Sequence, residues 1–288
     1  MQLLIKVLAA LGLTAGVLAI TAAVRKPDSV YKDKPSEQNP FEGKKVVFVE
    51  DEADPVNADG VRGHLVETTA ETARNVGVYE KVIKRSFDVF FSFAGMIILS
   101  PLLLVIGIAI FIDDPGPVIF TQKRIGKDKR FFKIHKFRSM RISASHDVPT
   151  HQLKDPEQYI TRIGRVLRKH SLDELPQIWD IWIGNMSIIG PRPALWNQNC
   201  LTALRDSVKL DDGRVVNANS VKPGLTGLAQ ISGRDELELE EKSRLDGEYC
   251  SNVSFFNDLR CFLGTIKIVL KHDGVVEGGT GKLHRTGN

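Results

Sequence analysis

The sequence predicts a membrane-associated α/β protein that is rich in helix, with short strands, one kinked re-entrant membrane helix and a separate N-terminal hydrophobic helix. Three observations lead to this prediction. Long apolar stretches occupy residues 7–24 and 89–112, a proline lies near the centre of the second stretch, and the chain beyond residue 113 alternates short strand-like and helix-like patterns. The 288 residues are enough for one sizeable domain and an appendage.

The N-terminal stretch Val7–Val24 carries no charge and is about as long as a helix that crosses a bilayer. Lys6 precedes it, and four basic residues follow between positions 25 and 34. This excess of positive charge predicts that residues 1–26 anchor the chain, with the following residues in the cytoplasm. A secretory signal peptide is the alternative, because Ala22 and Ala23 end the stretch.

Residues 27–78 are polar, and the segment from Glu50 to Glu80 is acidic. One short run, Val46–Val49, has the composition of a strand. The sequence therefore predicts a poorly ordered linker or a small appendage. At the other end of the chain, residues 273–288 are predicted to be a flexible tail. Gly281 and Lys282 resemble part of a phosphate-binding loop, but Val276 and Leu283 do not fit that motif.

The second apolar segment, residues 89–112, has 24 residues without a charge and lies between Asp88 and Asp113. A soluble protein would have to bury such a helix on every face, so a membrane helix is the better interpretation. Ser100 and Pro101 lie at its centre. Proline removes one backbone hydrogen bond and clashes with the preceding turn, which predicts a kink there.

Charges on both sides of this segment favour a helix that enters and leaves on the cytoplasmic side. The flanking basic residues are Lys81, Lys84 and Arg85 before it, and Lys123, Arg124, Lys127, Lys129 and Arg130 after it. A re-entrant helix broken at Ser100 and Pro101 satisfies both flanks, and the Ser100 hydroxyl could supply a partner for the exposed backbone. A plain kinked transmembrane helix is the alternative.

The remaining chain is predicted to fold as a mixture of short strands and helices. The predicted strands are residues 117–122 and 131–137, and the predicted helices are residues 160–168, 176–183 and 254–271. The last helix has an apolar face, so an interfacial helix and an ordinary core helix are equally good interpretations.

Composition excludes several classes of function. The net charge of +4 is too small to demand a nucleic-acid partner, and none is expected. Residues 123–141 contain nine Lys or Arg and one acid, which predicts contact with phosphates or anionic lipid. Three widely spaced cysteines and seven scattered histidines give neither a disulfide framework nor a zinc site.

Two adjacent carboxylates, Asp173 and Glu174, are the leading candidates for chemistry. Ser171 and Glu174 fit a capping box at the start of a helix, and Arg168 and Lys169 lie close by in sequence. These surroundings predict an ionised Asp173, which nucleophilic attack on phosphorus requires. Alternatively, the two acids only complement the helix dipole.

Two loops are candidates for phosphate binding or for backbone packing. In Gly190–Pro193, two prolines fix the backbone around Arg192, whose guanidinium could engage a diphosphate bidentately. The glycines of residues 222–234 allow close backbone approach to a ligand, although such loops are more often simple turns.

From about Tyr79 to Lys271 the chain resembles the bacterial sugar transferase family, which comprises the monotopic polyprenol-phosphate phosphoglycosyl transferases. The matching motifs, in order, are Lys84–Asp88, Ser100–Pro101, Gln122–Gly126, Lys136–Met140, Ser171–Gln177, Gly190–Pro193 and Lys222–Gly227. All of them occur over some two-thirds of the chain. The first 78 residues have no counterpart in the minimal members of this family.

This resemblance implies a function in which the enzyme moves a sugar 1-phosphate from a UDP-sugar to undecaprenyl phosphate and releases UMP. It implies that Asp173 is the nucleophile and forms an aspartyl phosphosugar, that Glu174 is its partner, and that Mg²⁺ is bound with Asp173 as a ligand. The residues implied near phosphates are Lys136, Arg138, Arg168 and Arg192. The implied location is the bacterial inner membrane, with the catalytic domain of residues 79–272 facing the cytoplasm, and a homodimer is compatible with the resemblance.

Overall fold

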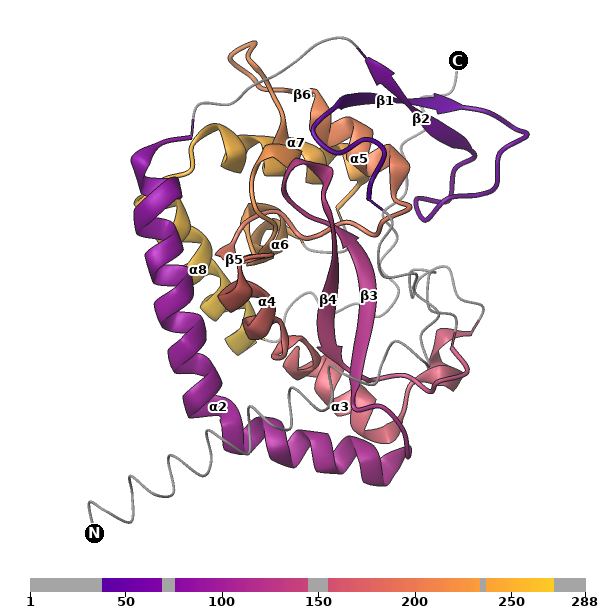
Figure 1. Ribbon diagram of the computed structural model, residues 1–288, viewed down its shortest axis with the longest axis vertical. Coiled ribbons are helices and arrows are strands. Elements are labelled where there is room, and N and C mark those ends of the chain that lie inside the picture. Colours follow the sequence, from indigo (N-terminus) through magenta and orange to yellow (C-terminus); the bar gives the residue numbers. More distant parts are fainter. Residues whose placement is uncertain (1–37, 69–75, 145–154, 234–236, 272–288) are drawn as a thin grey trace.

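The computed structural model describes residues 38–68, 76–144, 155–233 and 237–271 (Figure 1). In these residues helices and short strands are mixed and about half of the chain is helical, which confirms the predicted mixed class. The predicted N-terminal helix at 7–24 and the predicted tail at 273–288 lie outside the described residues.

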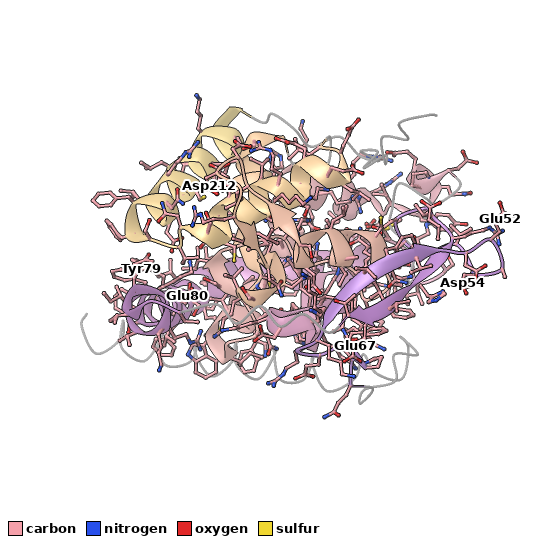
Figure 2. The ribbon with its side chains drawn as sticks, turned by 90° about the horizontal axis from the view of Figure 1, so that it is seen from above. Glu52, Asp54, Glu67, Tyr79, Glu80 and Asp212 are labelled. Atoms are coloured by element: carbon pink, nitrogen blue, oxygen red, sulfur yellow. The ribbon has the colours of Figure 1, made fainter. Side chains whose placement is uncertain are left out.

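An antiparallel hairpin forms the first described part of the chain. Strand β1 (Lys45–Glu50) pairs with strand β2 (Gly63–Thr68), so the predicted strand at Val46–Val49 is confirmed. Val46 is fully buried, whereas Val47 and Val49 are exposed on the other face. Figure 2 shows Glu52 and Asp54 of the connecting segment far across the molecule from Tyr79 and Glu80. Phe48 of β1 packs on the core cluster that contains Ile125 and Leu201, so this hairpin is a folded part of the structure.

A long bent helix follows. A π-helical turn (Tyr79–Lys84) leads into α2 (Arg85–Asp113), which runs in two limbs that meet at a sharp bend (Figure 1). Pro101 has no N–H to donate to the carbonyl of Ile97, and the Ser100 hydroxyl donates to that carbonyl instead (2.8 Å). The predicted kink and the role predicted for the Ser100 hydroxyl are both confirmed.

The first limb of α2 is fixed to the rest of the fold by the charged residues that precede its apolar part. The Arg85 guanidinium donates to the backbone carbonyls of Ile181 and Trp182 (2.6 and 2.7 Å), at the end of α4 (Gln177–Ile183). The buried Asp88 carboxylate accepts from the Ser187 hydroxyl and the Ile188 N–H (3.0 and 2.9 Å). These sequence-distant bonds orient the helix as it leaves the domain.

The second limb of α2 returns to the domain and packs on its core. Ile106 and Ile110 are buried in a cluster with Phe137 and Leu167. At its end, the Asp113 carboxylate accepts from the N–H of Ile163 (2.9 Å), in the first turn of α3 (Arg162–Lys169).

The remaining elements build the domain between the limbs and the hairpin. The strands are β3 (Ile119–Ile125), β4 (Phe131–Phe137), β5 (Ser187–Ile189), β6 (Val208–Lys209), β7 (Val215–Val216) and β8 (Gly224–Thr226). The helices are α5 (Asn199–Asp206), α6 (Leu228–Ser232), α7 (Leu239–Ser251) and α8 (Phe255–Lys271). β3–β4 and β6–β7 pair antiparallel, and β5–β8 pair parallel. The predicted strands and helices beyond residue 113 are thus confirmed, with small shifts at their ends.

Large apolar side chains are exposed along α2 and α8. The helical run from Tyr79 to Asp113 is largely exposed, since only 11 % of its most apolar stretch is buried. It is therefore not the core helix of a soluble protein. On α8, Phe256, Phe262 and Leu263 are exposed. A core helix would bury such residues, so the exposed face of α8 favours the interfacial interpretation.

Candidate active site

Asp173 and Glu174 lie in a single 3₁₀ turn (Leu172–Glu174) between α3 and α4. Ser171, immediately before the turn, has a left-handed backbone (φ 54°), and its side chain makes no capping hydrogen bond. The predicted capping box is therefore wrong. The chain closes a tight turn here instead of starting a helix, and α4 begins only at Gln177, after Pro176.

Glu174 is held by two cations from distant parts of the chain. Lys136 on β4 donates to Oε1 (2.9 Å), and the Arg192 guanidinium donates to Oε1 (2.7 Å). The Glu174 side chain is only 17 % exposed, so these bonds are little weakened by water. Burial alone would raise the pKa of Glu174, but Arg192 and Lys136 outweigh it and hold that pKa well below its usual range.

Asp173 has a different electrostatic environment from Glu174. Burial raises the pKa of its carboxyl, and the negative charge of Glu174 raises it further, against the opposing effects of Lys136, Arg168 and Arg192. Lys136 and Arg192 bond directly to Glu174, so they offset only part of the effect of burial on Asp173, and its predicted ionisation stays a prediction. The adjacent carboxylates have opposite pKa shifts, a pattern typical of catalytic pairs.

The structure brings together five of the six residues predicted for catalysis and phosphate binding. Lys136, Arg168 and Arg192 all act electrostatically on Asp173, as does Glu174. The sixth, Arg138, is held elsewhere. Its side chain is 2 % exposed and donates to the carboxylate (2.8 Å) and the backbone carbonyl of Asp114, at the end of α2. This pair ties the end of β4 to the end of α2.

The loop that carries Arg192 is supported by the glycine-containing segment at residues 222–227. The N–H of Gly190 donates to the Thr226 carbonyl, and the N–H of Gly224 donates to the Pro191 carbonyl (both 2.8 Å). A Cβ at Gly224 would collide with the backbone of Gly190. Glycine is thus required here by close packing of two loops.

Sequence reasoning missed several residues that hold the site in place. Arg205, which is buried on α5, donates to the backbone carbonyl of Arg192 (3.0 Å) and to Asp246. The buried Asp180 on α4 accepts from the N–H and the imidazole of His135 (2.9 and 2.8 Å), next to Lys136 on β4. These contacts span 13 to 45 residues, and no local spacing signals them.

A magnesium ion, which the resemblance implies, fits the chemistry of these residues. Among the residues that the structure describes, the Asp173 carboxylate has no hydrogen bond, whereas Glu174 is occupied by its two cations. Mg²⁺ commonly binds through one or two carboxylates together with substrate phosphates and water. Asp173 would be its protein ligand, and the bound ion would neutralise phosphate charge.

A second group of potential metal ligands, in the described part of the chain, lies in the hairpin. Carboxylate oxygens of Asp51 and Asp54 and a ring nitrogen of His64 lie within 4.8 Å of one another. The His64 imidazole is already bonded to Asp54 (2.6 Å), and the group is largely exposed. It is separate from the candidate active site.

Comparison with known proteins agrees with the geometry. Residues 79–272 match the model of the family described as bacterial sugar transferase. The chain is 36 % identical over 190 residues to the exopolysaccharide production protein PSS of Rhizobium leguminosarum bv. phaseoli, covering 64 % of this chain and 94 % of that protein. It is 36 % identical over 191 residues to the UDP-glucose:undecaprenyl-phosphate glucose-1-phosphate transferase of Escherichia coli, and 33 % identical over 208 residues to the undecaprenyl-phosphate galactose phosphotransferase of Salmonella typhimurium. These two matches cover 65 % and 67 % of this chain, but only 40 % and 42 % of the relatives.

Proposed function

Since the chain belongs to the bacterial sugar transferase family, we propose that it transfers a sugar 1-phosphate from a UDP-sugar to undecaprenyl phosphate. The names of two relatives, one for glucose and one for galactose, support this donor and acceptor class. A third relative is named an exopolysaccharide production protein, which supports a role in exopolysaccharide assembly. The observation that carries the proposal is the carboxylate pair surrounded by Lys136, Arg168 and Arg192.

The proposed reaction proceeds in two displacements at one phosphorus. The ionised Asp173 carboxylate attacks the β-phosphorus of the donor, the bond to the bridging oxygen breaks, and UMP leaves with that electron pair. An oxygen of the lipid phosphate then attacks the same phosphorus and releases Asp173. Because its pKa is raised in the absence of donor, Asp173 must lose any bound proton before the attack.

The cations around the pair supply what this chemistry needs most. Phosphoryl transfer between anions depends on charge neutralisation and alignment. Arg192 is 39 % exposed and already oriented by Glu174, so its guanidinium can contact the donor diphosphate without a large loss of entropy. Glu174 thereby acts as the residue that positions Arg192 and Lys136.

The bent helix gives a reason for the location of the site. Leu172 and Leu175, on either side of the carboxylates, pack on the cluster around Ile106 and Ile110 of the second limb. If both limbs of α2 enter the cytoplasmic leaflet of the inner membrane, the active-site turn lies at the level of the lipid phosphates. The exposed apolar residues of α2 and α8 support this placement.

The decisive experiment incubates the purified full-length protein, in lipid nanodiscs with Mg²⁺, with undecaprenyl phosphate and a panel of UDP-sugars. We expect UMP release that depends on the lipid acceptor, together with a lipid-linked sugar diphosphate. Release of UDP would indicate transfer of the sugar without its phosphate and would contradict the proposal. Omitting each substrate in turn provides the control.

A further inference from the structure

The hairpin β1–β2 lies outside the residues that match the family model, yet it contacts both ends of helix α5. At the N-terminal end, the Ala58 N–H donates to the Asn197 carbonyl (3.1 Å). The Asp59 carboxylate accepts from the N–H groups of Cys200 (2.7 Å) and Leu201 (3.3 Å). A side-chain oxygen there accepts from N–H groups that have no partner within the helix, so Asp59 caps α5 from outside the helix.

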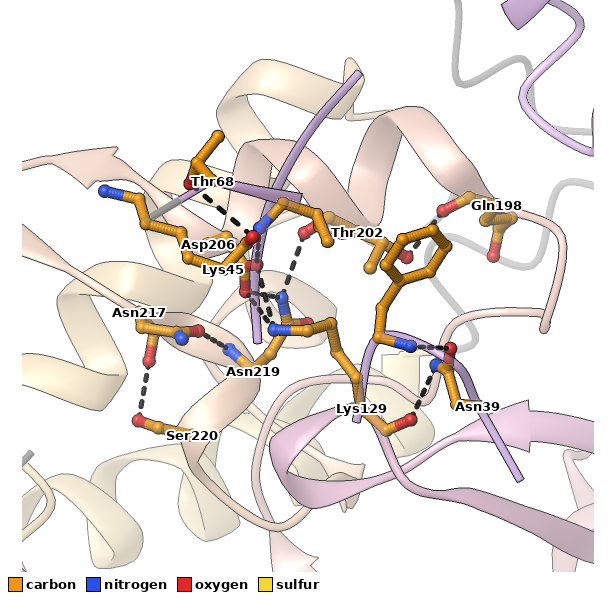
Figure 3. Close-up of polar contacts among 12 residues, drawn as sticks. Asn39, Lys45, Thr68, Lys129, Gln198, Thr202, Asp206, Asn217, Asn219 and Ser220 are labelled. Carbon is orange, nitrogen blue, oxygen red and sulfur yellow. Dashed lines mark hydrogen bonds and ion pairs between the residues drawn. The ribbon is translucent and has the colours of Figure 1, made fainter. Parts of the chain in front are cut away.

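The C-terminal end of α5 is held through a buried ion pair (Figure 3). Asp206, the last residue of α5, accepts from the Val46 N–H of β1 (2.9 Å) and from the ammonium of Lys129 (2.9 Å). The Asn219 amide also donates to Asp206 (2.7 Å), and the Lys129 carbonyl accepts from the Asn39 amide (2.7 Å). The Lys129 and Asp206 side chains are 2 % and 0 % exposed. The appendage therefore contributes directly to a buried polar network.

Helix α5 connects the hairpin to the loop that carries Arg192. Arg205 on α5 is fixed by Asp246 (2.9 Å) and donates to the Arg192 carbonyl (3.0 Å). A second, apolar connection runs in parallel, because Phe48 of β1 packs on the core cluster that contains Ala194. Displacement of α5 would thus be transmitted to the Arg192 backbone.

We propose that the hairpin is a positioning element for Arg192, with Asp59 as its key residue. By fixing α5, it holds Arg205 against the Arg192 carbonyl and so keeps the Arg192 guanidinium at Glu174. The predicted effect of the hairpin on kcat rests on the proposed function. Misplacement of a catalytic group by about 1 Å can reduce a rate by about a hundredfold, so a partial loosening should be measurable.

The test uses three variants of the full chain, each assayed for UMP release and normalised to folded protein. Asp59→Ala should lower kcat about tenfold, because α5 loses its cap. Asp59→Asn should stay within about threefold of the parent, since its side-chain oxygen can still accept both N–H groups. The matched control is Glu67→Ala on the same hairpin, whose exposed side chain pairs with Lys44 at the surface. A parent-like kcat for Asp59→Ala would overturn the proposal.

A double-mutant cycle separates positioning from a general loss of structure. If Asp59 acts through Arg192, then Asp59→Ala should have little further effect on kcat in an Arg192→Lys background. A merely structural role would lower kcat by the same factor in both backgrounds, and that additive result would also overturn the proposal.

Hydrogen exchange provides a readout that does not depend on the proposed function. Asp59→Ala should increase amide exchange in residues 190–196 and leave α4 unchanged. Unchanged exchange in residues 190–196 would overturn the positioning role even if activity falls. Conversely, if the parent releases no UMP with any donor, the proposed function fails while the exchange result still stands. Should Asp59→Ala not fold, Phe48→Leu tests the parallel apolar connection with the same measurements.

Discussion

Replacing Pro101 by leucine tests whether the bend in α2 determines the side of the membrane that receives the catalytic domain. A straight helix of 29 residues would be about 43 Å long, enough to cross a hydrocarbon core of roughly 30 Å. The uncharged parts of the limbs, residues 89–100 and 101–112, are each about 18 Å long and too short to cross. Leucine restores the missing N–H and removes a penalty of about 3 kcal/mol against a continuous helix.

Contacts in the finished fold oppose straightening. Burial of Ile106 and Ile110 contributes about 1.5–3 kcal/mol each, and the pair of Arg138 with Asp114 adds to this. Together they outweigh the gain from removing Pro101, so a folded variant keeps its bend. The effect of Pro101→Leu therefore arises during insertion, before these contacts exist, and we expect mixed topology or poor insertion.

Cysteine labelling from each side of the membrane measures this outcome. Single cysteines near Lys81 and near Lys127 are introduced into a background that lacks the three native cysteines, all of which are buried. In the parent, both sites should be labelled only from the cytoplasm, whereas Pro101→Leu should expose part of the Lys127 site to the periplasm. Leu104→Ile, an exposed position on the same helix, is the matched control. Labelling of the parent Lys127 site only from the periplasm would rule out the re-entrant helix, and parent-like labelling of Pro101→Leu would show that the proline does not determine topology.

Four further predictions concern the active site and its supports. Asp173→Asn should abolish UMP release while membrane association and Tm stay unchanged, because an amide is a very poor nucleophile; activity within tenfold of the parent would refute the assignment. Glu174→Gln should lower kcat strongly and shift the acidic limb of the pH–rate profile to lower pH, because the Glu174 charge helps to raise the pKa of Asp173. Arg138→Met should cost about 1–3 kcal/mol of stability, measured by denaturant unfolding in detergent, because Asp114 loses the bonds from the buried guanidinium. The KM for the donor should be unchanged. Burial raises the pKa of Asp59 from 3.8 to about 6, so the protonated carboxyl stabilises the fold at low pH, and this contribution is lost as the pH rises through about 6. The Tm of the parent relative to Asp59→Asn should therefore increase as the pH falls from about 7 to 4. A difference in Tm that stays constant with pH would contradict this.

The main elements of the fold could be predicted because their signals are local. The bend at Pro101 follows from one missing N–H, and the hydroxyl that compensates for it is the neighbouring residue. The strands β3 and β4 are rich in aromatic and β-branched residues and lie on either side of a basic turn. The docking of the hairpin on α5 could not be predicted, since the bond from Val46 to Asp206 joins residues 160 positions apart.

The sequence predicted which residues make up the candidate site, but not how the charges around the two carboxylates are paired. The motifs identified Asp173 and Glu174, but only the folded chain shows that Lys136 and Arg192 bond to Glu174 and leave the pKa of Asp173 raised. Arg138 illustrates the opposite difficulty. It lies two residues from Lys136 in the same basic motif, yet its guanidinium bonds to Asp114. The motif does not reveal this partner, which is 24 residues away in the sequence.

The bond from the Ser100 hydroxyl to the Ile97 carbonyl also constrains the order in which α2 can change during evolution. If α2 enters the membrane as proposed, a lineage that lost Ser100 while keeping Pro101 would leave that carbonyl without this donor in the hydrocarbon, where water cannot replace it. A lineage that replaced Pro101 first would regain the backbone bond and retain a serine whose hydroxyl can still bond within its own helix. We therefore expect descendants of this chain to lose the proline before the serine, and the intermediate with proline alone to be rare.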